Sequence, residues 1–192
     1  MKLYCATSNP GKLREFALAA GPDWEFTPLT GIPPCAETGA TFEENAMEKA
    51  LYYSRHAPGL LFAEDSGLEV DSLGGAPGVR SARFAGEEAG DDDNNRLLLE
   101  KLRGVTDRSA RYVCVVALAK AGNPLGKFRG EVAGRIIDQP LGANGFGYDP
   151  YFFYEPFGLT FGQASPAQKL QVSHRGRALA EMLRWLKSHI PD

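Results

Sequence analysis

Apolar and polar positions at the start of the chain change in blocks that predict a strand, a loop and a helix. Residues 3–6 form a short apolar block, residues 7–11 form a polar turn, and residues 12–20 place apolar side chains on one helical face. The next segment, 21–39, is rich in proline and glycine, which favours loop structure around a short strand at 25–28.

Four further helices are predicted, three of them from their start signals. Thr41 is a candidate N-cap with Glu44 as its capping-box partner, and the helix should reach about residue 55. Three aspartates precede a helix at 94–103, as the helix dipole favours. Ser165 followed by proline is typical of a helix start, and a final amphipathic helix is expected at 177–189.

Two adjacent acids follow an apolar run in the middle of the first half. The run 60–63 predicts a short buried strand, so Glu64 and Asp65 should emerge at its end, where a ligand crevice can form. A glycine-rich loop is expected to continue from there to residue 86.

The second half contains the strongest strand patterns. Residues 112–119 and 126–137 are predicted strands joined by a turn at 122–124, which makes a hairpin, and 151–153 is a further short strand. Helices mixed with strands and a hairpin predict an α/β fold with a mixed β-sheet flanked by helices. At 192 residues we expect one domain, 1–192.

Composition narrows the function classes. A net charge of −3 argues against nucleic-acid binding through a broad basic surface. No apolar run approaches the roughly 18 residues of a membrane span, and the first apolar stretch is too short for a signal peptide, so we expect a cytoplasmic protein without a membrane partner. Three widely spaced cysteines fit reduced, packed thiols, and three histidines favour an oxygen-ligated cation over a histidine cage.

Four stretches carry candidate chemistry, and the first is a turn before a helix. Its backbone N–H groups and lysine could hold an anion, although the spacing is not that of a Walker A loop and an ordinary solvated turn is the alternative. The residues are Thr7, Ser8, Asn9, Pro10, Gly11 and Lys12.

The second stretch is the acid set Glu44, Glu64 and Asp65. Magnesium takes one or two carboxylates together with waters and phosphates, and a carboxylate beside a metal-bound water could act as general base. Helix capping is the alternative role for Glu44, and an Asp-capped turn at Ser66 is the alternative for Asp65.

The third and fourth stretches bring aromatic rings and cations. In "GANGFGYDP", Phe146 or Tyr148 could stack on a nucleobase while Asp149 accepts a hydrogen bond; a tight turn with both rings at the edge of the core is the alternative. In "QKLQVSHRGRAL", Lys169, His174 and Arg175 could donate to a carbonyl or phosphate oxygen, or could be solvated basic residues at a helix start.

Together these stretches resemble the inosine triphosphate pyrophosphatase family, in the family's order and along nearly the whole chain. The matching segments are "TSNPGKLREF", "TFEENAMEKA", "AEDSGLEVDSLGGAPGVRSARFAG", "GFGYDP" and "SHRGRAL". The resemblance implies an elongated two-lobed fold with a central substrate cleft, a homodimer, and magnesium-dependent hydrolysis of ITP, dITP and XTP to the monophosphate and pyrophosphate. Glu64 stands where some members have aspartate, and Gln168 and Leu170 flank Lys169 where other residues are frequent.

The resemblance also implies a role for each matching residue. Glu44 and Asp65 would bind Mg²⁺, and Asp65 would be the general base for attack of water on the α-phosphate. The substrate would be contacted by Thr7 to Lys12, chiefly at the triphosphate, by Ser66 and Lys169, by Phe146, Gly147, Tyr148 and Asp149 at base and sugar, and by His174 and Arg175 at the 6-oxo group.

Three rival functions remain open at this point. A pyrophosphatase for other modified nucleotides would share the metal and phosphate chemistry. An acyl hydrolase could use Ser66 with His174 and an aspartate, although the chain has no G-x-S-x-G elbow. A non-enzymatic nucleotide-binding regulator would bind ITP without turnover.

Overall fold

The chain folds around a seven-stranded mixed sheet, in a computed structural model that describes residues 1–7 and 9–190. The strand order is β2-β1-β3-β4-β5-β6-β7. β1 pairs in parallel with β2 and β3, whereas β5, β6 and β7 pair antiparallel. The strands are β1 (Lys2–Ala6), β2 (Glu25–Pro28), β3 (Leu61–Val70), β4 (Ser109–Lys120), β5 (Asn123–Ile136), β6 (Phe152–Tyr154) and β7 (Leu159–Thr160).

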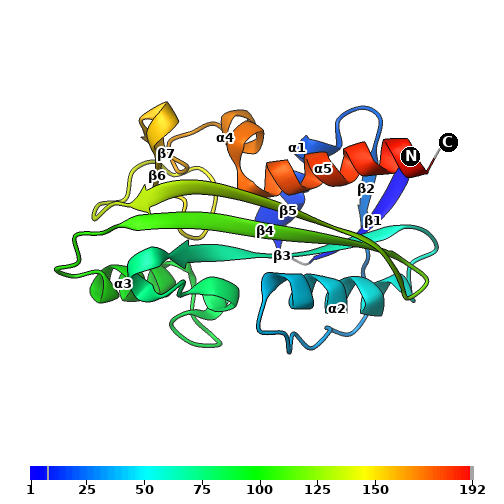
Figure 1. Cartoon of the computed structure of the whole chain (residues 1–192), viewed down its shortest axis with the longest axis horizontal. Helices are drawn as coiled ribbons and strands as arrows, with labels where there is room; N and C mark the ends of the chain where they lie inside the picture. Colours follow the sequence, from blue (N-terminus) through cyan, green and yellow to red (C-terminus); the bar gives the residue numbers. More distant parts are fainter. Residues whose placement is uncertain (8, 191–192) are drawn as a thin grey trace. The chain divides into compact units, whose positions relative to one another are not determined.

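Five α-helices accompany the sheet in the described part of the chain (Figure 1). They are α1 (Pro10–Ala20), α2 (Phe42–Ser54), α3 (Asp91–Lys101), α4 (Pro166–Val172) and α5 (His174–His189). The predicted α/β class with a mixed sheet is therefore confirmed. Within residues 1–7 and 9–190, every helix falls short of the length and apolarity needed to cross a bilayer.

The chain divides into two compact units, each with a core of its own. Unit 1 consists of residues 1–65, 114–130 and 174–192, and unit 2 consists of residues 66–113 and 131–173. β3, β4 and β5 each supply residues to both units. The expectation of one domain across 1–192 stays a prediction.

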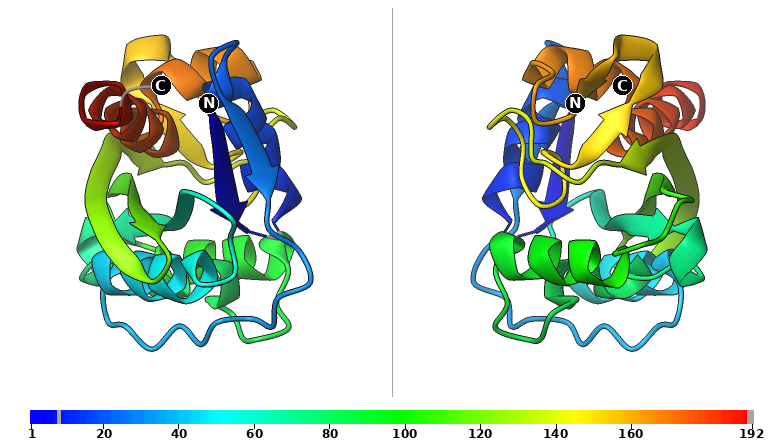
Figure 2. Two further views of the ribbon diagram at one scale, coloured as in Figure 1. Left: turned by 90° about the vertical axis from the view of Figure 1, so that its right-hand side faces the viewer. Right: turned by 90° about the vertical axis from the view of Figure 1, so that its left-hand side faces the viewer.

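The core of unit 1 forms between its strands and two helices. α1 and α5 cover one face of these strands and α2 lies on the other face (Figure 1, Figure 2). Phe62 of β3 packs edge-on against Phe16 of α1, with ring centroids 5.0 Å apart, and Met182 of α5 is fully buried in the same cluster. β4 is buried along almost its whole length, as expected for a central strand covered on both faces.

The core of unit 2 is rich in aromatic rings. Phe152 is fully buried, with ring centroids 4.6 Å from Tyr112 and 5.0 Å from Phe161. Leu98 and Leu102 bring α3 into the same cluster. Burying large rings removes much apolar area from water, which is the main force that stabilises such a core.

The starts of α2 and α4 match the sequence signals, whereas α1, α3 and α5 begin earlier than predicted. Thr41 caps α2 with Glu44 as its capping-box partner, and Ser165 caps α4 in the same way with Gln168. α3 begins at Asp91, because the three aspartates form its first turn rather than precede it. α5 begins at His174, earlier than predicted.

The strand prediction for 60–63 was wrong in one important respect. β3 runs on to Val70, so Glu64 and Asp65 lie inside the strand and not at its end. The sequence suggested an end because two acids normally leave a core, but here both carboxylates are buried and paired with cations. The loop expected up to residue 86 contains the rest of this strand and two 3₁₀ helices, Asp71–Leu73 and Gly78–Arg83.

The predicted hairpin is confirmed, with longer strands. β4 and β5 are neighbours in the sheet, and residues 121–122 connect them. The turn therefore lies earlier than 122–124, since Asn123 and Pro124 already belong to β5. β7, a strand of two residues, was not predicted because so short a segment carries no period.

Candidate active site

Asp65 is held by two side chains of α2. Its carboxylate is buried, with the residue 5% exposed. Asn45 donates from Nδ2 to Oδ2 at 3.2 Å, and Lys49 donates from Nζ to Oδ1 at 3.2 Å. Asn45 and Lys49 are one helical turn apart and therefore share a face of α2. Each oxygen of the proposed base thus has a partner from the same helix.

Lys49 joins Asp65 to a second carboxylate. Its Nζ also lies 3.2 Å from Oε1 of Glu37, in the segment before α2. Burial would lower the pKa of the lysine, but the carboxylates of Asp65, Glu64 and Glu37 outweigh it and raise the pKa. Burial also raises the pKa of Asp65, while the Lys49 charge opposes that shift. A raised pKa suits a carboxylate to taking up a proton.

Glu64 is the centre of a separate buried network in unit 1. Its carboxylate contacts Nζ of Lys12 and lies 3.5 Å from Nη2 of Arg175, which also pairs with Glu15. Sγ of Cys114 donates to Oε2 at 3.4 Å.

Charge pairing determines the protonation of this network. Burial would raise the pKa of Glu64, but Lys12 and Arg175 outweigh it and hold that pKa well below its usual range. The Glu64 and Glu15 carboxylates likewise outweigh burial and raise the pKa of Arg175. Glu64 and Arg175 are therefore both charged in the folded protein at neutral pH.

The turn before α1 is organised by its own side chains. Oδ1 of Asn9 accepts from the N–H groups of Gly11 and Lys12 at 2.8 and 3.1 Å, and Oγ1 of Thr7 accepts from the N–H of Asn9. Pro10 opens the helix, and Ser8 lies outside the described residues. The sequence places Lys12 at the unfavourable end of the helix dipole, and the anion that compensates it is Glu64.

Glu44 has the capping role that the sequence left open. Its Oε2 accepts from the N–H groups of Ala40 and Thr41 at 2.7 and 3.1 Å. Whether it also binds a metal stays a prediction. Ser66 follows Asp65 in β3 and is partly buried.

In unit 2, Asp149 contacts two other predicted substrate-binding residues, Phe146 and Lys169. Its Oδ2 accepts from Nζ of Lys169 at 2.5 Å and from the N–H of Phe146 at 2.9 Å, and Oδ1 accepts from the hydroxyl of Tyr112 at 3.3 Å. Asp149 is 1% exposed. The Lys169 ammonium also lies 5.0 Å from the centroid of the Phe146 ring. The buried ion pair between Asp149 and Lys169 therefore joins the segment "GFGYDP" to the segment "QKL".

The two rings of the glycine-rich loop differ in their surroundings. Tyr148 is 4% exposed, packs in the core of unit 2 and donates to the carbonyl of Ser81 at 2.8 Å, which matches the core-packing alternative. Gly147 between them is held by α3: its N–H donates to Asp91 at 2.6 Å and its carbonyl accepts from Asn95 at 3.0 Å. Phe146 is only partly buried.

The basic residues at the start of α5 are buried. His174 is 3% exposed and Arg175 is 2% exposed, so the alternative of solvated basic residues is wrong for both, and for Lys169 at 4%. Gly130 of β5 lies against this helix start, because a Cβ there would fall 2.1 Å from the His174 carbonyl oxygen. The close approach requires glycine.

Sequence reasoning missed several residues that the structure brings to these clusters. In unit 1 they include Glu15, Glu37, Asn45 and Lys49, and in unit 2 they include Asp91, Asn95 and Tyr112. The spacing of Asn45 and Lys49, buried polar residues on one face of α2, was the detectable signal.

Among the described residues, the cysteines form no disulfide and no cluster of side chains forms a metal site by itself. The three cysteines are free, and Cys5 and Cys114 are buried, as predicted. Between residues 1 and 190, Ser8 excepted, no group of three His, Cys, Asp or Glu side chains is arranged to hold a metal. The oxygens of Asp65 and Glu37 are nevertheless donors of the type that Mg²⁺ prefers, and both already contact a cation, Lys49.

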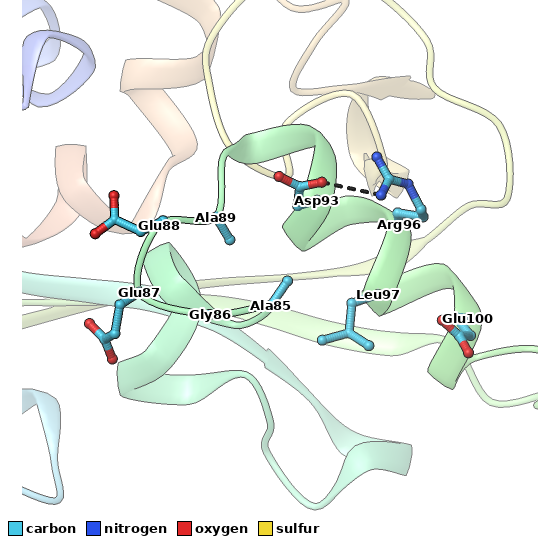
Figure 3. A pocket seen from close by; sticks show the side chains of 9 residues that line it. All are labelled: Ala85, Gly86, Glu87, Glu88, Ala89, Asp93, Arg96, Leu97 and Glu100. Carbon is cyan, nitrogen blue, oxygen red and sulfur yellow. Dashed lines mark ion pairs between the residues drawn. The ribbon is translucent and has the colours of Figure 1, made fainter.

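A surface pocket of about 590 Å³ in unit 2 is lined by none of the predicted site residues (Figure 3). It lies beside α3, where Asp93 and Arg96 form an ion pair at 3.2 Å. Its lining is Ala85, Gly86, Glu87, Glu88, Ala89, Asp93, Arg96, Leu97 and Glu100.

Comparison with known proteins gives full-length matches. The sequence model of the Ham1 family matches residues 3–185. A dITP/XTP pyrophosphatase of Acidobacterium capsulatum is 47% identical over 196 residues, which covers 95% of this chain and 97% of the relative. One from Exiguobacterium is 47% identical and is covered completely.

Solved structures agree with this match. The Staphylococcus aureus Ham1 protein superposes with a TM-score of 0.87 at 39% identity, covering 98% of this chain and 99% of that one. A nucleoside-triphosphatase, dITP/XTP pyrophosphatase, from Mycobacterium abscessus gives a TM-score of 0.74 at 38% identity. It covers 95% of this chain.

Proposed function

Because the chain belongs to the Ham1 family, we propose that it is a nucleoside-triphosphate diphosphatase that hydrolyses ITP, dITP and XTP to the monophosphate and pyrophosphate. The observation that carries the proposal is the 47% identity, along 95% of the chain, to a protein named dITP/XTP pyrophosphatase. Removal of such nucleotides would keep them out of DNA and RNA.

Asp65 is the general base in this proposal. Its pKa is raised by burial, and its two oxygens are fixed by Asn45 and Lys49. A base must be held within hydrogen-bond reach of the proton that it takes. Asp65 would accept a proton from the water that attacks the α-phosphorus, which breaks the bond to the leaving pyrophosphate.

Asp65 also belongs to the proposed Mg²⁺ site, with Glu44 as its predicted companion. Glu37 is a further candidate, because it shares the Lys49 ammonium with Asp65 while Oε2 of Glu44 accepts two backbone N–H groups. When bound, the ion would neutralise phosphate charge and stabilise the leaving group. Comparison of Glu37→Gln with Glu44→Gln separates the two ligands by their apparent Mg²⁺ requirement.

Phosphate binding is assigned to the turn before α1, from Thr7 to Lys12, together with Ser66 and Lys169. Lys12 stands in the first turn of α1, where its ammonium contacts Glu64, so a phosphate would share this cation with the carboxylate. A phosphate there would meet a preorganised cation and not a mobile side chain.

Base recognition is assigned to residues 146–149 and to His174 and Arg175. The ring of Phe146 offers a surface on which a purine can stack. If His174 and Arg175 donate to a 6-oxo group, the 6-amino group of adenine presents hydrogens to donors. Such a polar mismatch discriminates by about 10⁴ or more.

A substrate panel tests the proposal. Pyrophosphate release is measured from ITP, dITP, XTP, ATP, GTP and dUTP, with Mg²⁺ and with chelator. We expect Mg²⁺-dependent turnover of the first three and little of the others. A preference for dUTP would favour a pyrophosphatase for other modified nucleotides, and tight ITP binding without turnover would favour a regulator.

Homodimerisation, which the family resemblance implies, and a cytoplasmic location, which the short first apolar stretch led us to expect, also belong to the proposal. Sedimentation analysis of the purified protein and fractionation of cells test these two points. A purely monomeric protein, or one recovered with membranes, would contradict them.

A further inference from the structure

Asn45 connects the proposed base to the backbone of the loop before α2. It is 1% exposed. Its Oδ1 accepts from the N–H of Gly39 at 2.8 Å, and its Nδ2 donates to Oδ2 of Asp65 at 3.2 Å. The loop lies directly against this amide, because a Cβ on Gly39 would fall 2.8 Å from Oδ1. One end of the amide is therefore fixed by backbone and the other faces Asp65.

This arrangement restricts a torsion that is otherwise free. The terminal torsion of an aspartate is broad and roughly two-fold, so packing alone does not set the plane of its carboxylate. Donors on both oxygens do set it, and here Lys49 holds Oδ1 while Asn45 holds Oδ2. Lys49 is a flexible side chain, whereas Asn45 is short and tied to Gly39.

We propose that Asn45 is a positioning residue for Asp65, which orients the carboxylate through Nδ2 while its Oδ1 is anchored on the Gly39 backbone. The inference rests on the proposed function, in which Asp65 is the general base. Groups that hold a reacting side chain through hydrogen bonds govern its geometry, and small misplacements at the reacting atoms have large effects on rate.

Unit 2 contains a similarly bonded buried asparagine, Asn94, whose amide donates to a backbone carbonyl and not to a carboxylate. Asn94 also lies four residues after the N-cap of its helix, α3, and is 3% exposed. Its Oδ1 accepts from the N–H of Ala85 at 2.8 Å, and its Nδ2 donates to the carbonyl of Ala82 at 3.1 Å. Asn94 matches Asn45 in its burial, in its two side-chain hydrogen bonds and in its position in the helix. The two residues differ in the acceptor of Nδ2, which is a backbone carbonyl for Asn94 and the Asp65 carboxylate for Asn45. Asn94 is therefore a matched control.

The experiment compares four variants, Asn45→Asp, Asn45→Ala, Asn94→Asp and Asn94→Ala. Aspartate keeps an oxygen for the backbone N–H and loses the donor, whereas alanine removes the amide without adding charge. Steady-state kinetics with ITP and Mg²⁺, urea unfolding, and binding of the non-hydrolysable α,β-methylene analogue of ITP are measured for each. All kinetics are run well below the unfolding midpoints.

Both Asn45 variants are expected to lose about tenfold to a hundredfold in kcat, since the base is misplaced, with KM and analogue affinity within about twofold of wild type. The Asn94 variants should show similar shifts in urea midpoint and wild-type kcat. Wild-type kcat in the Asn45 variants, a loss confined to KM, or an equal kcat loss in the Asn94 variants would each overturn the inference. A wild-type protein that releases no pyrophosphate from ITP would instead refute the proposed function, and this inference with it.

Discussion

Glu64→Gln tests whether the buried network of unit 1 stabilises the fold through charge pairing. The side chain of Glu64 is 1% exposed and that of Arg175 is 3% exposed. Glutamine keeps the shape but removes the charge, so Lys12 loses its carboxylate partner and Arg175 keeps only that of Glu15. Breaking a buried pair by removing one partner costs about 3–5 kcal/mol. Because Arg175 retains one carboxylate, we expect about 3 kcal/mol.

Urea unfolding gives the free energy directly, and thermal unfolding gives a second estimate. For a chain of this length, each kcal/mol shifts the Tm by about 2–4 °C, so the expected drop is about 6–12 °C. Glu155→Gln is the control, because Glu155 pairs with Arg135 at 2.5 Å but is 63% exposed. An exposed pair contributes about 0–1 kcal/mol. A Glu64→Gln cost no greater than that of the control would refute the reasoning.

The pH dependence of stability provides an independent check on Glu64. Its folded pKa is depressed by Lys12 and Arg175, so the unfolded chain binds the proton more tightly. The resulting stability is fully present above the unfolded pKa, about 4.3, and is lost as the pH falls below it. Glu64→Gln should therefore lose less stability on acidification below about pH 4 than the wild type does.

Three further substitutions have defined outcomes. Asp65→Asn should retain binding of the α,β-methylene analogue and lose about 10² or more in single-turnover rate with ITP; a loss below tenfold would remove Asp65 as base. Gly39→Ala should lower the free energy of unfolding in urea by about 1–3 kcal/mol, because the new Cβ would fall 2.5 Å from Cβ of Glu44. Gly59→Ala is the control and should cost less than about 1 kcal/mol, because the nearest atom to its new Cβ, in the Tyr4 ring, is 3.6 Å away. Equal costs for the two variants would contradict this account. Asp149→Asn should destabilise by about 3 kcal/mol because Lys169 stays buried without its carboxylate, and an unchanged urea midpoint would refute this pairing.

Local signals predicted most of the fold. The capping box at Thr41 and the proline after Ser165 placed two helix starts correctly, because such start signals depend on residues a few positions apart. The apolar runs on both sides of a short turn likewise predicted the central hairpin, because its two strands are adjacent in the sequence. Element ends were less accurate where polar residues continue a buried element, as Asp65 does in β3.

The partners of the buried charges could not be predicted from the sequence. Arg175 pairs with Glu15 across 160 positions of the chain, and no local pattern specifies such a contact. The sequence left open whether Lys12 binds an anion or belongs to a solvated turn, and no local pattern pointed to Glu64 as its partner. The role of Tyr148 depended likewise on the tertiary core, which encloses its ring and satisfies its hydroxyl.

The identity of the phosphorus products tests the central claim most directly. ITP is incubated with the protein and Mg²⁺, and the products are resolved by phosphorus NMR. Hydrolysis at the α-phosphorus predicts IMP and pyrophosphate in equal amounts, with no IDP at any time. Accumulation of IDP and inorganic phosphate, or intact ITP throughout, would contradict the account.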